Sequence, residues 1–102
     1  MKSKGVQYEF SAKIWYSSSD GIHGWYFISL PKELAKEIRD NLKFLEEGWG
    51  RMKVTAKIDN SEWKTAIWFD TKNDTYLLPL KAEIRKKEKI EIDNEVKTLI
   101  WI

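Results

Sequence analysis

The sequence predicts a mainly β domain, a small α+β fold in which about six strands form a closed barrel with one amphipathic helix. Three observations carry this prediction. Apolar and polar residues alternate with period two in several segments, turn-forming residues separate those segments, and one segment has helical spacing. The length of 102 residues suits one domain, so we expect residues 1–102 to fold as a single unit.

The first half of the chain contains two strands and the helix. Residues 6–16 alternate strictly, which predicts a half-buried strand, and the serines and glycine of residues 17–21 predict a turn. Residues 25–30 form an aromatic strand between Gly24 and Pro31. Apolar residues then recur at helical spacing from Leu34 to Leu45, which predicts a helix over residues 32–46 that ends before Gly48.

The second half predicts four further strands. Residues 51–58 and 62–69 alternate around a tight polar connection, which is the pattern of a hairpin. A short strand over residues 75–78 precedes Pro79, which we expect to open a short helical segment over residues 80–87. Asp93 and Asn94 predict the turn before a last strand over residues 95–102.

The two halves share a pattern. Residues 27–34 and residues 75–82 both run from an aromatic strand through Leu-Pro into a Lys/Glu-rich turn, and Pro31 and Pro79 are 48 residues apart. Leu-Pro dipeptides are common, so coincidence is the alternative, but the matching flanks favour a duplication with pseudo-repeats at about residues 6–58 and 62–102. Two such halves can interleave into one closed barrel.

Several stretches together resemble a known family. The likeness covers nearly the whole chain and rests on residues 8–10 with 25–31, residues 48–51 with 54–58, and residues 63–65 with 76–81 and Arg85. In these stretches the chain resembles the prokaryotic domain-of-unknown-function family 1905. The resemblance implies a double-split β-barrel, distantly similar in fold to the swapped-hairpin barrels of AbrB- and MazE-type regulators. Those barrels use two chains, whereas the two halves of this chain would suffice.

Composition narrows the location and chemistry of the protein. The chain has no cysteine, which excludes disulfides and thiolate chemistry, and its net charge is +2 from 18 basic and 16 acidic residues. The absence of cysteine and the heavy Lys and Glu usage are typical of heat-adapted proteins. No apolar run is long enough to span a bilayer and the start lacks a signal-peptide core, so we expect a cytoplasmic protein without a membrane partner.

Catalysis is not favoured by the sequence. His23 is the only histidine, and an enzyme that uses it as a base is the weakest of three functional hypotheses, because a solvated loop histidine is the favoured explanation. The acidic residues show no spacing for a carboxylate pair or a metal site, and no phosphate-binding loop is present. We therefore expect no catalytic residues, no metal and no cofactor.

The leading hypothesis is a non-catalytic binding or interaction module with an aromatic surface. Six tryptophans are many for this length, and alternation places Trp15, Trp68 and Trp101 on the nominally polar faces of three strands. If these strands are neighbours, their indoles form a patch for a small ligand, another partner or a second copy of the chain. The alternative is that the helix or a twin subunit covers them.

The second hypothesis is a nucleic-acid-binding regulator of the AbrB-like type. A basic cluster surrounds the second Leu-Pro turn, and its members are Lys81, Arg85, Lys86 and Lys87, with Lys89 beside them. Such a cluster can gain phosphate affinity by counterion release. An ordinary solvated helix face explains the same residues, because Glu83 and Glu88 dilute the charge.

Overall fold

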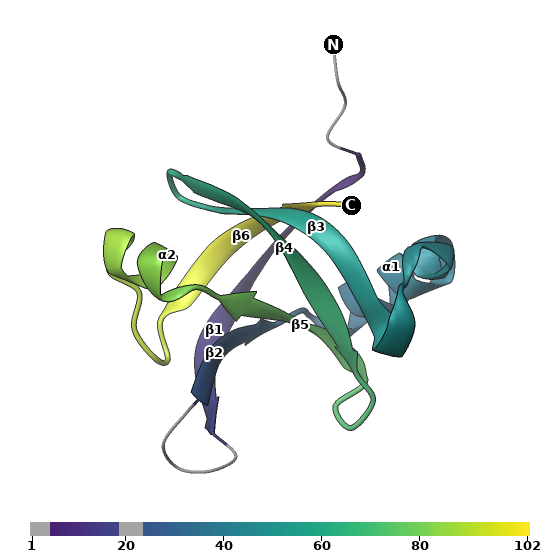
Figure 1. Cartoon of the computed structure of the whole chain (residues 1–102), viewed down its shortest axis with the longest axis horizontal. Helices are drawn as coiled ribbons and strands as arrows, with labels where there is room; N and C mark the ends of the chain where they lie inside the picture. The colour runs from purple at the N-terminus through teal and green to yellow at the C-terminus, as the bar shows by residue number, and fades with distance from the viewer. Residues whose placement is uncertain (1–4, 19–23) are drawn as a thin grey trace.

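The protein is a closed barrel of antiparallel strands. The computed structural model describes residues 5–18 and 24–102, apart from the side chain of Trp49. The strands of this part of the chain are β1 (Gln7–Ser18), β2 (Gly24–Ser29), β3 (Arg51–Ile58), β4 (Ser61–Asp70), β5 (Thr75–Leu80) and β6 (Glu95–Trp101). Their order around the barrel is β1–β2–β5–β4–β3–β6 (Figure 1). The predicted fold class is confirmed.

Alternation along the strands builds the core. Phe10 and Ile14 of β1 are buried, whereas Val6 and Tyr16 at the ends of the same apolar face are 47% and 42% exposed, so only the middle of this face meets the core. The other strands contribute buried side chains in the same way: Ile28, Met52, Val54, Ala56, Ile58, Trp63, Ile67, Tyr76, Leu78, Leu80 and Ile100. Because successive side chains point to opposite sheet faces, the residues between them form the outer surface of the barrel.

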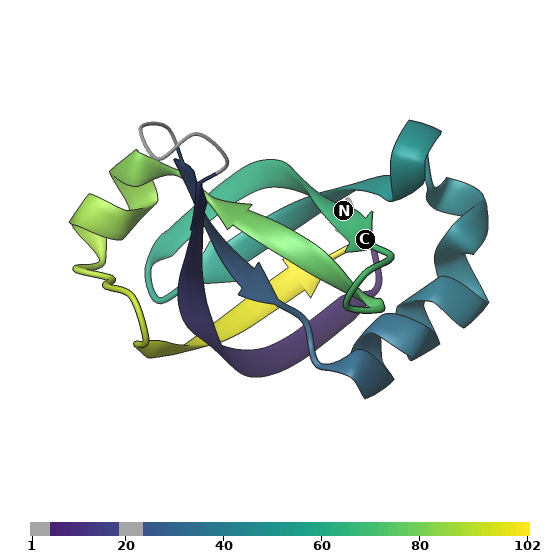
Figure 2. The same cartoon turned by 90° about the horizontal axis from the view of Figure 1, so that it is seen from below.

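Two helices lie at opposite ends of the barrel (Figure 2). Helix α1 (Lys32–Leu42) buries Ala35 and Ile38, and the short helix α2 (Ala82–Lys87) buries Ile84. The Ser61 hydroxyl at the start of β4 hydrogen-bonds Glu88 just beyond α2. No helix in residues 5–18 and 24–102 has both the length and the apolar character needed to cross a membrane.

The predicted helix over residues 32–46 is wrong at its end. Helix α1 stops at Leu42, and two short 3₁₀ turns follow, η1 (Lys43–Leu45) and η2 (Gly48–Gly50). Leu45, expected on the buried stripe, is 42% exposed. The chain leaves the helix axis here and the Glu46 carboxylate accepts a hydrogen bond from the Tyr76 hydroxyl at 2.6 Å. This contact comes from a distant strand, so helical periodicity does not report it.

The second proline plays a different part from the one predicted. Pro31 occupies the N-cap position of α1, but Pro79 lies inside β5 and pairs with Phe27 of β2, and α2 begins only at Ala82. The ladder on the β4 side of β5 has already ended at Leu77. A residue without an N–H group is tolerated at such an open strand edge.

Strand β1 runs two residues further than predicted, because Ser18 pairs with Gly24.

The strand order is symmetric between the two halves of the chain. Each half of the chain runs strand, strand, helix, strand. In the first half these elements are β1, β2, α1 and β3, and in the second half they are β4, β5, α2 and β6. β2 pairs with β5, β3 pairs with β6, and both pairs are antiparallel. This arrangement is the one that two interleaved repeats would produce, and the duplication itself stays a prediction from the sequence.

Candidate functional site

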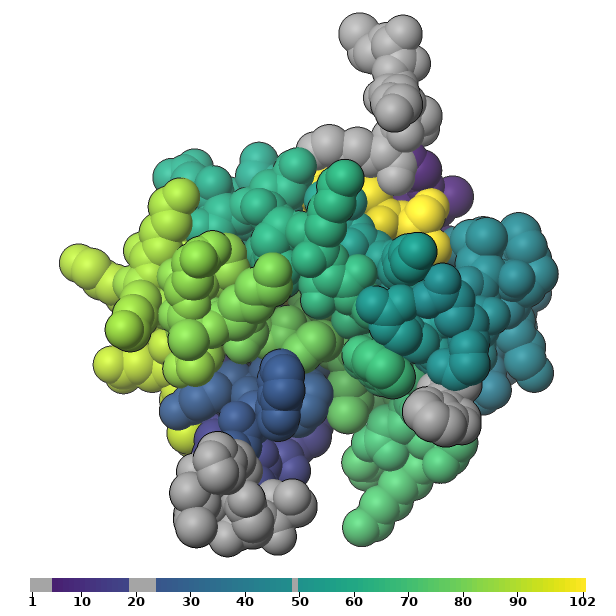
Figure 3. Space-filling view, in the orientation of Figure 1, coloured from purple at the N-terminus to yellow at the C-terminus, as the bar shows by residue number. Residues whose placement is uncertain are grey.

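A groove opens on the outside of the barrel where β4 and β5 separate. The ladder between them has three residue pairs, from Trp68 with Leu77 to Asp70 with Thr75, so the earlier part of β4 has no β5 partner in this ladder. Figure 1 shows the two strands spreading apart from their connecting loop, and Figure 3 shows the same face with its side chains filled in. The groove has a volume of about 640 Å³.

Indoles and cations dominate the lining of this groove. We call it the tryptophan groove and define it by three indoles and four cations: Trp25, Trp68, Trp101, Arg51, Lys53, Lys64 and Lys81. Alternation places Ala66 on the same outer face of β4 as Lys64 and Trp68, and Ala66 is only 4% exposed. Its small side chain forms part of the floor and leaves room for a ligand above it.

The three indoles come from three different strands. Trp25 of β2 is 64% exposed and Trp68 of β4 is 38% exposed, which is unusual for so large an apolar side chain. Trp101 of β6 is half-buried, and its indole N–H donates to the Gln7 side-chain oxygen at 3.1 Å. An exposed group of this kind on a folded domain usually marks a ligand or partner site.

The cations are placed between the indoles by strand register. On the outer face Arg51 lies opposite Trp68 and Lys53 lies opposite Ala66. Thr55 lies between Lys64 on β4 and Trp101 on β6. The guanidinium carbon of Arg51 is 5.5 Å from the centroid of the Trp68 ring, within the range of a cation–π contact.

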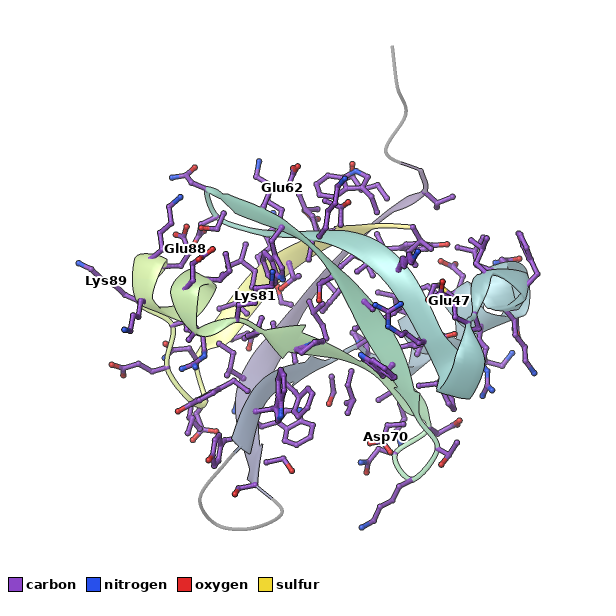
Figure 4. The ribbon with its side chains drawn as sticks, in the orientation of Figure 1. Glu47, Glu62, Asp70, Lys81, Glu88 and Lys89 are labelled. Carbon is purple, nitrogen blue, oxygen red and sulfur yellow. The ribbon has the colours of Figure 1, made fainter. Side chains whose placement is uncertain are left out.

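Lys81 closes the groove on the other side. It follows β5 directly, and Figure 4 shows it beside the region where β4 and β5 separate. Within the part of the chain that the structure describes, neither Lys64 nor Lys81 forms a salt bridge. Their charges therefore remain available to an anion.

One carboxylate touches the cations from outside the lining. Glu47 makes a salt bridge to Arg51 at 2.5 Å and lies 3.6 Å from the Lys53 ammonium group. Figure 4 shows Glu47 toward the start of β3, on the side of α1. Glu47 is 45% exposed at its side chain, so water and salt screen these pairs. It lowers the positive potential at one end of the groove and leaves the other end unchanged.

The segment that carries Glu47 is held by contacts of the preceding residue with β5 and α1. The carboxylate of the preceding residue, Glu46, accepts the Tyr76 hydroxyl and lies 3.5 Å from the Arg39 Nε atom. Burial and this hydrogen bond raise the pKa of Tyr76, which keeps the phenol protonated. Gly50 then turns the chain with a φ of +70° into β3, where Arg51 is the first residue. A polar contact in the interior thus sets the position of one wall of the groove.

The predicted basic cluster divides into two parts. Lys81 lines the tryptophan groove, whereas Arg85 stacks on Tyr26 with 3.7 Å between the guanidinium carbon and the ring centroid. Lys86 and Lys87 are exposed on the last turn of α2. A smaller depression of about 210 Å³ shares Trp25 and Lys81 with the tryptophan groove and extends it to Arg85. The cationic surface therefore continues past the groove toward α2.

The structure brings together two of the three predicted tryptophans. Trp68 and Trp101 line the tryptophan groove, whereas Trp15 is outside its lining. The Trp15 indole N–H donates to the Ser29 hydroxyl at 2.9 Å, and its ring packs on Phe27 with 5.0 Å between centroids. Alternation placed all three on outer strand faces, but it does not tell which strands are neighbours.

The remaining sequence hypotheses concern acid–base and metal chemistry. His23 lies outside the residues that the structure describes. Among residues 5–18 and 24–102, no three His, Cys, Asp or Glu side chains come close enough together to hold a metal ion.

Sequence reasoning missed four members of the groove. Trp25, Arg51, Lys53 and Lys64 were not singled out, although alternation alone puts each on the outer face of its strand. The missing signal is the register between β3 and β4, which pairs Arg51 with Trp68. A basic residue opposite an aromatic one in a predicted hairpin is the pattern that could have pointed to it.

These features define a class of protein: a closed six-stranded antiparallel barrel, within the described residues, with a basic, tryptophan-lined groove on its outer face. The family described as "Domain of unknown function (DUF1905)" matches residues 10–100 of the chain. The chain therefore belongs to this family, as its sequence resemblance implied. No curated protein matches the chain.

Proposed function

We propose that this protein is a non-catalytic binding module and that the tryptophan groove binds an anionic ligand with a flat ring. One observation carries the proposal: within the described residues, every charged side chain that lines the groove is a cation, although the chain as a whole has 18 basic and 16 acidic residues. A surface with no functional role would mix both signs, as the rest of this chain does.

The two kinds of side chain supply complementary interactions. An indole face stacks on a flat ring, and neighbouring cations attract a negative group held beside that ring. Arg51, Lys53 and Lys64 stand on the same outer sheet face as Trp68, so a ligand on this face reaches both kinds of group. The strands fix the backbone positions of these residues before a ligand arrives, which lowers the entropy cost of binding.

The chemistry of the lining supports binding more than catalysis. The groove's described lining offers two threonine hydroxyls, Thr55 and Thr65, but no side-chain carboxylate, imidazole or thiol to activate them. Self-association through this face is also disfavoured, because a second copy would bring four cations against four cations of the same kind. A ligand of opposite charge removes this repulsion.

A pair of matched probes tests the proposal. Anilinonaphthalene sulfonate combines a flat ring system with one negative charge, and N-phenylnaphthylamine has the same rings without the charge. We would titrate both into ¹⁵N-labelled protein and follow the backbone and indole N–H signals. The sulfonate should shift signals of β3, β4 and the Trp68 and Trp101 indoles, and the neutral probe should bind more weakly.

Two variants locate the site. Lys53→Gln with Lys64→Gln should weaken sulfonate binding, whereas Lys32→Gln with Lys43→Gln, which removes the same charge at α1 and η1, should not. Equal binding of both probes, or shifts confined to another face of the barrel, would refute the proposal.

A further inference from the structure

We infer that the ligand of the tryptophan groove is single-stranded nucleic acid. This inference rests on the proposed function and deepens it by naming the ligand class. It combines three observations: the indoles stand apart on separate strands, the cations lie between them, and the cationic surface continues beyond the groove to α2.

The separated indoles favour a ligand with more than one ring. Trp25 lies on β2, Trp68 on β4 and Trp101 on β6, so no single small ring can stack on all three. Arg51 lies opposite Trp68 and Thr55 lies opposite Trp101. These two residues of β3 are four positions apart, which corresponds to about 13 Å at the rise of a strand. A strand of nucleic acid presents a flat base at every residue and can meet several of these indoles in turn.

The cations favour a ligand with repeated negative charge. Arg51 lies opposite Trp68, Lys53 and Lys64 lie further along the same outer face of β3 and β4, and Lys81 lies across the opening. The smaller depression that shares Trp25 and Lys81 with the groove leads on to Arg85. A phosphate backbone carries one charge per nucleotide and would follow this track, whereas a mononucleotide would leave most of it unused.

The exposed indoles favour single strands over duplexes. The faces of paired bases are stacked inside a duplex and cannot meet a tryptophan ring, but the faces of unpaired bases are open. Trp25 is 64% exposed and Trp68 is 38% exposed, so both present ring surface without prior rearrangement. Stacking of this kind tolerates any base, and we therefore expect little dependence on sequence.

The strength of salt dependence can be estimated from the groove. Glu47 pairs with both Arg51 and Lys53, and its single charge offsets one of these two cations. With Lys64 and Lys81 this leaves a net of three cationic contacts for phosphates. Three contacts on a single strand predict that log K falls with log salt at a slope of about −2. Removing two of the lysines should bring that slope to about −0.7.

The experiment measures fluorescence anisotropy of labelled oligothymidylate and oligouridylate of about 12 nucleotides, at salt concentrations between about 50 and 200 mM. Shorter oligomers of each series test whether affinity rises with length. The two series separate DNA from RNA as the source of the shared chemistry. A duplex of the same length, an oligoglutamate and vesicles of phosphatidylserine are competitors from other ligand classes.

The inference predicts a specific set of results. Both single strands should bind, affinity should increase from dinucleotide to 12-mer, and the duplex should bind more weakly. Trp68→Ala should weaken binding by about 5- to 100-fold, because one stacked base is lost. Lys53→Gln with Lys64→Gln should flatten the salt slope as estimated above.

Matched variants control for general effects of charge and aromatic loss. Phe44→Ala removes an aromatic side chain that is 79% exposed on η1, away from the groove, and should leave binding unchanged. Lys32→Gln with Lys43→Gln should keep the salt slope. Circular dichroism of every variant shows whether it is folded.

Several outcomes would overturn the inference. The first is that neither single strand binds at protein concentrations up to about 100 μM. The second is that the duplex, the oligoglutamate or the vesicles bind as tightly as the single strands or more tightly. The third is that Lys53→Gln with Lys64→Gln leaves the salt slope unchanged. If the sulfonate probe still maps to the groove in that case, the proposed function stands and only the ligand class is wrong. If the sulfonate probe also fails, both fall together.

Discussion

The contact between Tyr76 and Glu46 gives a direct test of what stabilises the fold beside the tryptophan groove. Tyr76 is fully buried in β5, and its hydroxyl donates to the Glu46 carboxylate at 2.6 Å. Tyr76→Phe removes only the hydroxyl and keeps the ring, which packs edge-on against Phe69 with 5.2 Å between centroids. The variant therefore isolates the polar contact from the apolar packing.

The expected loss of stability follows from the chemistry of this pair. A hydrogen bond to a charged group contributes about 1.5–3 kcal/mol. After the substitution the Glu46 carboxylate, of which 10% is exposed, keeps the Arg39 Nε atom at 3.5 Å as a partner. We expect a loss of about 2 kcal/mol in the free energy of unfolding at pH 7, or about 8–16 °C in Tm for a domain of this size.

The same pair predicts an alkaline loss of stability. Burial and the hydrogen bond from Tyr76 to Glu46 raise the pKa of Tyr76 in the folded state. An unfolded tyrosine titrates near pH 10, so the stabilisation is complete below about pH 10 and is lost as the pH rises above it, by up to about 1.4 kcal/mol per pH unit. The sign follows because the unfolded chain releases the proton first.

Urea unfolding monitored by circular dichroism at about pH 7, 9 and 11 measures both effects. The difference in stability between the wild type and Tyr76→Phe should shrink by about 1.4 kcal/mol from pH 9 to pH 11, because the variant has lost this titrating group. Tyr16→Phe, which changes an exposed tyrosine of β1, should keep the wild-type alkaline loss. A constant difference across pH, or a loss below about 0.5 kcal/mol at pH 7, would refute the reasoning.

Two further predictions concern the wall of the groove. Glu47→Gln removes the carboxylate that pairs with Arg51. The variant should bind the sulfonate probe about 3- to 5-fold more tightly, because a unit charge at about 4 Å in water contributes about 1 kcal/mol. Titration of the wild type and the variant at low salt checks this, and weaker binding by the variant would contradict it. Gly50→Ala should destabilise the domain by about 1–3 kcal/mol, since Gly50 has a φ of +70° and a Cβ there would lie 2.8 Å from the Phe69 Cβ. Gly48→Ala, where a Cβ meets nothing within 4 Å, is the control, and thermal unfolding that shows equal losses for both would contradict the argument.

Local patterns were enough to predict most elements of the fold. The alternation of β3 and β4 and the polar residues between them predicted the hairpin, and the structure pairs Ile58 with Ser61 around a left-handed Asp59. Helical spacing predicted α1 through Ala35 and Ile38, which are its buried residues. These features depend on neighbours in the sequence, so the sequence reports them directly.

Boundaries and roles that depend on distant residues could not be predicted in the same way. The segment that follows α1 contacts β5 through a hydrogen bond between Glu46 and Tyr76, which are 30 residues apart in the chain. The place of Pro79 in a strand depends on its pairing with Phe27 and on the end of the β4 ladder at Leu77. A local rule sees only a proline before a helix.

The sequence by itself determined the class of fold, the family and the outward direction of Trp68 and Trp101, because period two settles which face of a strand a side chain occupies. Only the tertiary structure decided which outward residues share a surface. In the closed barrel the ladder between β4 and β5 stops at Trp68 and Leu77, and the register of β3 sets Arg51 and Lys53 beside that opening. A binding surface on a barrel depends on strand order and register, and these are set by contacts between residues far apart in the chain.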